Sequence, residues 1–104
     1  MMALIPRGIE PHVLQKAEAD RAMASGASAL LGHGIEVCFS VDGVLSWCHG
    51  EISRVTADSV KVRYYDDGMH LVHARFKMQH YGVKKQPVEQ QGGGLSQYYW
   101  RLLH

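Results

Sequence analysis

Apolar and polar residues alternate through the middle of the chain, in the pattern of β-strands with one buried face. In residues 36–41 the apolar side chains occupy every second position, and residues 60–64 repeat this spacing. Side chains two positions apart share one face of a strand, so each segment presents one row of side chains to a core. The pattern predicts β-structure over residues 34–81.

Turn residues divide this region into short segments. Asp42-Gly43 favours a tight hairpin, and Ala57-Asp58 and Asp66-Asp67-Gly68 mark two further turns. Residues 43–46 are expected to form a loop before the second strand. The predicted strands cover residues 36–41, 47–55, 59–65 and 71–72, followed by a helical turn and a short last strand within residues 76–81.

Five short strands joined by tight turns fit a small, strongly bent barrel, because such a barrel leaves few open edges. The predicted fold is therefore mainly β, a five-stranded barrel over residues 34–81. Its core is expected from the apolar residues Ile35, Val37, Ile52, Val55, Val60, Val62, Leu71 and Phe76.

The residues before the predicted barrel form an Ala-rich extension, residues 1–33. Pro11 suits the first turn of a helix, and apolar residues follow at roughly helical spacing, which predicts one helix over residues 11–24. The alternative is a frayed tail, because isolated helices of this length are only marginally stable.

The residues after it, 82–104, combine a flexible glycine linker with an apolar C-terminal segment. Tyr98, Tyr99 and Trp100 lie in this segment and carry too much apolar area to stay in water without consequence. We expect Tyr99 and Trp100 to be at least partly buried, either by this chain, against the barrel or the N-terminal helix, or by a second copy. The alternative is that the segment docks on a partner protein.

Length and charge limit the class of protein. A chain of 104 residues allows one domain with a modest core. Eleven basic against ten acidic residues give a net charge of +1, which argues against affinity based on nonspecific phosphate contacts. Weak nucleic-acid contact stays open if Lys84 and Lys85 lie beside Arg75 and Lys77.

The cysteines and the apolar runs indicate a compartment. Cys38 and Cys48 fall inside predicted strands and are interpreted as small buried hydrophobes rather than a disulfide, which favours a reducing environment. No apolar run approaches the ~20 residues of a membrane span, and residues 1–5 are too short for a signal-peptide core. We expect a soluble intracellular protein with no membrane contact.

Residue types that carry catalysis or bind metals are present without the spacing that either needs. His70, His73 and His80 have no accompanying CxxC or HExxH pattern, so ordinary surface or core histidines are favoured over a metal site. Nothing resembles a nucleophile elbow, a phosphate loop or a paired acid and base. The sequence predicts neither an enzyme nor a cofactor.

Two segments in order, WCHGEI at residues 47–52 and VKVRYYDDG at residues 60–68, follow a first strand that ends in Phe39. With these residues the chain resembles a Tudor domain of the Royal family of SH3-like barrels, over about half of its length. It is most similar to Tudor domains that read methylated lysine in histone tails. The resemblance implies a five-stranded SH3-like barrel.

The resemblance also implies an aromatic cage for a methylated cation. A methylated ammonium has lost hydration but kept its charge, so it favours the negative faces of aromatic rings. A carboxylate at the mouth binds any remaining N–H, which favours mono- or dimethylated over trimethylated groups. The implied cage consists of Phe39, Trp47 and Tyr64, with Tyr65 as a substitute for Tyr64, and of Asp66 or Asp67.

The function expected from this resemblance is a reader module for methylated lysine or methylarginine in the tail of a partner protein. Such a partner is a histone or an RNA-associated protein, within a nuclear chromatin or RNA-processing assembly. The alternative is a cage-less SH3-like barrel that serves as a scaffold subunit or binds nucleic acid. The basic strand residues that would support nucleic-acid binding are Arg54, Lys61, Arg63 and Arg75.

Overall fold

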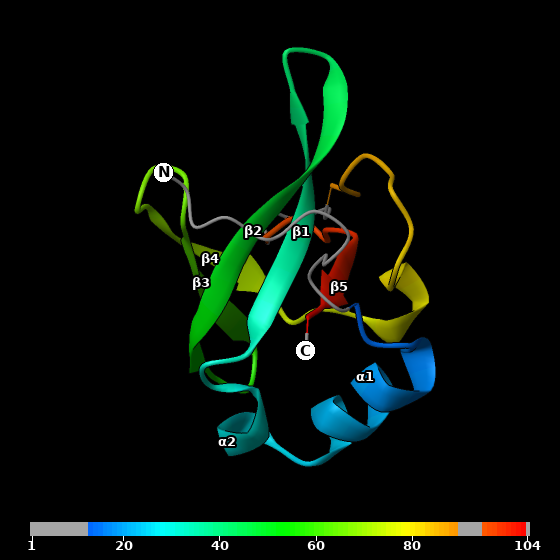
Figure 1. Ribbon diagram of the computed structural model, residues 1–104, viewed down its shortest axis with the longest axis vertical. Helices are drawn as coiled ribbons and strands as arrows, with labels where there is room; N and C mark the ends of the chain where they lie inside the picture. Colours follow the sequence, from blue (N-terminus) through cyan, green and yellow to red (C-terminus); the bar gives the residue numbers. More distant parts are fainter. Residues whose placement is uncertain (1–12, 90–94, 104) are drawn as a thin grey trace, which may run out of the picture.

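Five antiparallel strands form one sheet in the order β4-β3-β2-β1-β5 (Figure 1). The structure is a computed structural model that describes residues 13–89 and 95–103. The predicted mainly β architecture with five strands is confirmed. Strands β4 and β5 are the two edges of the sheet. The strands are β1 (Gly34–Val41), β2 (Val44–Val55), β3 (Ser59–Tyr64), β4 (His70–Ala74) and β5 (Trp100–Leu102).

A two-residue turn sets the register of the first hairpin. Asp42 and Gly43 both have positive φ, at 51° and 79°, as a type I′ turn requires. Val41 therefore pairs directly with Val44, and β2 begins three residues before its predicted start. The expectation of a loop over residues 43–46 is wrong, because the turn needs only Asp42 and Gly43.

Gly50 allows β2 and β3 to approach each other closely. A Cβ atom at this position would lie 2.6 Å from the carbonyl oxygen of Arg63 and 2.7 Å from Val62 Cγ1. The first of these neighbours is backbone, so the strands themselves would have to separate.

Replacing Gly50 by alanine is expected to lower the free energy of unfolding by about 1–3 kcal/mol, as for other overpacked core sites. Gly34→Ala is the matched control, because the nearest atom to its new Cβ would be Leu103 Cβ at 3.3 Å, a contact that a shift of a few tenths of an ångström relieves. Urea denaturation of both variants measures the difference. Equal loss of stability in the two would contradict a special role for the close approach at Gly50.

Two short helices cover one end of the sheet (Figure 1). Helix α1 (Lys16–Ala24) begins later than residue 11, where the predicted helix began. Residues 11 and 12 of that prediction lie outside the described part of the chain. Leu14 is extended instead, because its N–H donates to the carbonyl of Leu102 at 2.9 Å. Helix α2 (Ala27–Leu30) was not predicted, and it buries Leu30 in the core.

The fifth strand comes from the C-terminal segment and not from residues 76–81. The helical turn expected there is present as η1 (Met78–His80), but Tyr81 forms only a single bridge, to Trp100. In β5, Trp100 pairs with Val37 and Leu102 pairs with Ile35 of β1. The prediction of a last strand within residues 76–81 is wrong, because the position beside β1 is taken by β5.

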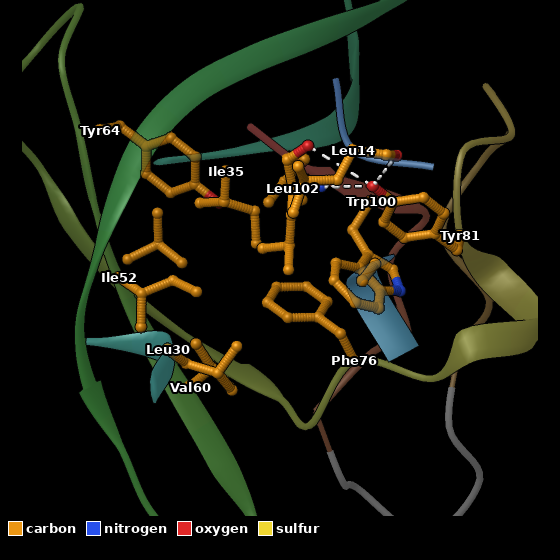
Figure 2. Packing of buried hydrophobic residues seen from close by; sticks show 13 residues of the cluster. Leu14, Leu30, Ile35, Ile52, Val60, Tyr64, Phe76, Tyr81, Trp100 and Leu102 are labelled. Carbon is orange, nitrogen blue, oxygen red and sulfur yellow. Dashed lines mark hydrogen bonds between the residues drawn. The ribbon is translucent and has the colours of Figure 1, made fainter. Parts of the chain in front are cut away.

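Trp100 lies at the centre of the packing between the tail and the rest of the chain. Its side chain is fully buried, and its ring stacks on Phe76 and meets Tyr81 edge to face (Figure 2). The Tyr81 hydroxyl donates to the carbonyl oxygen of Leu14 at 2.6 Å. Tyr99 is half-buried against His80. The expected burial of Tyr99 and Trp100 is confirmed, and this chain provides it.

Most of the predicted core is buried. Val55 and Leu71 are only partly buried, whereas the other six predicted residues are enclosed. The residues that the prediction omitted come from the segment before α1, the two helices, the end of β3, Tyr81 and the tail. They are Leu14, Ala19, Leu30, Tyr64, Tyr81, Trp100 and Leu102.

The two cysteines lie on opposite faces of the sheet. Val37 pairs with Cys48 and Cys38 pairs with Trp47, and paired residues share a face. Both are free thiols, with Cys38 buried and Cys48 half-buried. In the described part of the chain, no helix has the length and apolar character needed to cross a membrane.

Candidate functional site

A pocket of about 220 Å³ opens beside the turn that joins β3 and β4. Four of the six predicted cage residues line it, namely Phe39, Tyr64, Asp66 and Asp67. Alternation explains this grouping, since Phe39 and Tyr64 lie on the same face of the sheet as the core. The remaining lining residues are Ser40, Val41, Cys48, His49, Met69 and Leu71.

Phe39 and Tyr64 provide two adjacent aromatic walls. Their ring centroids are 5.5 Å apart and their planes meet at 76°. Because the two rings are nearly perpendicular, they border the pocket from two different directions. Phe39 is half-buried, whereas Tyr64 is only 5% exposed.

A hydrogen bond to His73 holds the Tyr64 ring. The Tyr64 hydroxyl oxygen lies 2.6 Å from His73 Nε2. Burial raises the pKa of the Tyr64 hydroxyl and lowers the pKa of His73 to about 4, so Tyr64 keeps its proton and His73 is neutral at pH 7. The hydrogen bond therefore joins two uncharged groups.

Two carboxylates give the pocket a negative rim. Asp66 and Asp67 are exposed in the turn that ends β3, where Gly68 has a φ of 70°. The Met69 N–H donates to Asp67 Oδ1 at 2.9 Å, which orients that carboxylate. Burial, and then the charge of Asp66, raises the pKa of the Cys48 thiol, so this lining residue stays uncharged at neutral pH.

Trp47 does not line the pocket. It pairs with Cys38, on the face opposite to that of Val37 and Cys48. The guanidinium of Arg101 lies 4.3 Å from the centre of the Trp47 ring, and Arg101 Nε is 2.7 Å from Glu36 Oε1. The chain's own cation therefore covers one face of the indole, and the structure does not bring Trp47 together with Phe39 and Tyr64.

Tyr65 also lies outside the pocket lining. Its exposed ring meets His49 edge to face at 4.9 Å, and the guanidinium of Arg63 lies 5.3 Å from its centre. Arg63 in turn forms an ion pair with Glu51 at 2.7 Å. Tyr65 is thus adjacent to His49, a lining residue, but is not itself a wall.

Sequence reasoning missed two aromatic side chains behind the pocket, His73 and Tyr98. The Tyr98 ring lies 4.9 Å from Phe39 and 4.8 Å from His73 between centroids. Alternation in β4 places His73 on the same face as Leu71, which is a signal that the sequence contains. No local pattern places Tyr98 there, because its position depends on the path of the tail.

The other candidate residues are dispersed or already engaged. Among the described residues, no three His, Cys, Asp or Glu side chains group as a metal site would require. Arg63 is paired with Glu51, and Arg75 Nη1 donates to the carbonyl of Thr56 at 3.0 Å. Arg54 and Lys61 face each other across β2 and β3.

Comparisons with known proteins do not place this chain in a family. No protein-family model matches it, and no curated protein or solved structure is detectably similar to it. The candidate site therefore rests on its geometry and on the chemistry of its side chains.

Proposed function

We propose that the pocket between Phe39, Tyr64 and the Asp66-Asp67 turn binds a methylated lysine or methylarginine side chain in the tail of a partner protein. The observation that carries this proposal is the combination of two aromatic rings at 76° with two carboxylates on one small pocket. A cation that has partly lost its hydration is the ligand that such a combination favours.

The size of the pocket suits a side-chain head group. Its volume of about 220 Å³ lies below the range of roughly 300–1,000 Å³ that is typical of sites for whole drug-sized ligands. Each ring contributes on the order of 0.5–2 kcal/mol when it faces a desolvated cation. The carboxylates of Asp66 and Asp67 add attraction and accept a hydrogen bond from a remaining N–H, which favours mono- and dimethylated forms.

We further infer an SH3-like barrel of the Tudor type. The five antiparallel strands, the tight turns and the place of the motifs support this inference, since residues 47–52 lie in β2 and residues 60–68 span β3 and the acidic turn. On this basis the partner is a histone or RNA-associated protein, and the assembly is a nuclear one engaged in chromatin or RNA processing.

Replacing Phe39 by leucine is expected to weaken binding of a dimethyllysine peptide by about 3- to 30-fold, because one aromatic face is lost while apolar volume is kept. Asp66→Asn and Asp67→Asn are each expected to weaken binding as well, because each removes a negative charge from the rim. The amide introduced by Asp67→Asn would still offer an oxygen that accepts the hydrogen bond from the Met69 N–H. Titrations of methylated histone and arginine peptides, followed by amide chemical shifts, measure these changes.

Trp47→Leu is the matched control for this experiment. Trp47 does not line the pocket, so its replacement is expected to leave peptide affinity unchanged. Binding that is insensitive to Phe39→Leu but lost in Trp47→Leu would contradict the assignment of the site. Absence of binding to every methylated peptide would contradict the proposed function itself.

The alternative is a cage-less scaffold subunit or a nucleic-acid-binding barrel, and the basic residues bear on the second of these. Two of its four basic strand residues, Arg63 and Arg75, already bind groups of this chain. Nucleic-acid affinity that falls steeply with salt, without affinity for methylated peptides, would favour this alternative.

A further inference from the structure

A second hollow adjoins the pocket between Phe39, Tyr64 and the Asp66-Asp67 turn, which is called the methyl-cation pocket below. It has a volume of about 290 Å³ and lies between β4 and the segment before β5. Leu71 lines both hollows, so the two are neighbours across this side chain. The residues around the second hollow, here called the edge groove, are Leu71, Val72, His73, Leu95, Ser96 and Tyr98.

The edge groove runs along the free edge of β4. Leu71 and Val72 are consecutive and point to opposite faces of the sheet, yet both line the groove. A hollow that both side chains reach lies beside the strand and not on one face of it. Within the described residues, β4 pairs only with β3, so no other strand is hydrogen-bonded to its outer edge.

The backbone of Val72 faces this free edge. The Tyr64 N–H donates to the Met69 carbonyl at 2.9 Å, in the same register as the β3-β4 ladder. Hydrogen-bonded and non-hydrogen-bonded pairs alternate along antiparallel strands, so Val72 turns its N–H and C=O away from β3. These groups are available to an added strand.

The side chains of the edge groove select for an apolar occupant. Val72 is 49% exposed and Leu95 is 45% exposed, although both are large aliphatic residues. None of the described residues that line the groove is Asp, Glu, Lys or Arg, and burial keeps its one imidazole, His73, neutral at pH 7. The neighbouring pocket differs in that it carries Asp66 and Asp67.

We propose that the edge groove binds the extended segment of the same methylated tail, with an apolar side chain two residues from the methylated one. This proposal rests on the proposed function. The two hollows adjoin at Leu71, and side chains two positions apart in an extended peptide point the same way and lie roughly 7 Å apart. Backbone hydrogen bonds to β4 align the peptide, and the groove selects the apolar side chain.

The acidic pocket and the neutral groove together define the ligand class. A peptide with a methylated cation and an apolar residue at this spacing matches both, because its cation meets Asp66 and Asp67 and its apolar side chain meets the uncharged groove. The occupant that this combination favours is therefore an extended peptide segment.

The test compares dimethyllysine peptides that differ only in carrying leucine or serine two residues from the modified lysine, on either side. On the side of the lysine where the residue reaches the edge groove, the leucine peptide is expected to bind the parent protein about tenfold more tightly than the serine peptide. Val72→Ser and Leu95→Ser are expected to remove this preference and to leave the affinity of the serine peptide unchanged. Val83→Ser is the matched control, since Val83 is 43% exposed and does not line the groove.

The outcomes separate the two proposals. Equal affinity for leucine and serine peptides, with both weakened by Phe39→Leu, would overturn the edge-groove proposal and leave the methyl-cation pocket intact. Absence of binding to all methylated peptides would overturn both. A concentration-dependent dimer that Val72→Ser abolishes, measured by sedimentation, would assign the groove to a second copy and overturn the peptide assignment.

Discussion

Replacing Trp100 by alanine is expected to lower the free energy of unfolding by about 3–5 kcal/mol. The side chain is fully buried, it stacks on Phe76 with centroids 5.3 Å apart, and its indole N–H donates to the Lys77 carbonyl at 2.8 Å. The variant leaves a cavity and an unpaired acceptor. Because small domains have only about 5–15 kcal/mol of stability, this loss would bring the protein close to unfolding.

Thermal and urea denaturation measure the effect, and Trp47→Ala is the matched control. Trp47 is half-buried on the face of the sheet opposite to Val37 and Cys48, where Arg101 covers one face of its ring. Its loss is expected to lower stability by only about 1 kcal/mol, the order of a single cation–π contact. Similar losses for the two tryptophans would contradict the central position of Trp100 in the fold.

Acidification from pH 6.5 to pH 4 is expected to remove about 3 kcal/mol of stability through His73 alone. Burial lowers the pKa of His73 from 6.5 to about 4 in the folded protein. In this range the unfolded chain binds a proton that the folded chain does not, so protonation favours unfolding. The contribution of His73 is fully present above pH 6.5 and is lost as the pH falls toward 4.

Urea denaturation at pH 7, 5.5 and 4.5 measures this dependence in the parent protein and in His73→Phe. The phenylalanine keeps an aromatic ring among Phe39, Phe76 and Tyr98 but does not titrate, so the acid-dependent loss is expected to shrink. Burial and nearby Lys77 also lower the pKa of His80, so His80→Asn is the control that reports the second histidine. An unchanged pH dependence in His73→Phe would show that other groups cause the loss.

Local pattern determined the strands and the inner face of the site. The period-two spacing of residues 36–41 and 60–64 was sufficient to predict β1 and β3, and the same rule placed Phe39 and Tyr64 on the core side. Asp42-Gly43 specified a tight turn because both residues accept positive φ. These features depend on neighbouring residues only, so the sequence contains them directly.

Only the tertiary structure decided the rest. The type I′ turn shifted the start of β2 to Val44, and the resulting register turned Trp47 away from the pocket and toward Arg101. Strand β5 has three residues, too few for a periodic signal, and it forms because Trp100 fills the space between Phe76 and Tyr81. The position of Tyr98 beside Phe39 depends on the same packing of the C-terminal segment against the sheet. Periodicity determines which side chains share a face, whereas the choice of partner strand depends on packing between residues far apart in the chain.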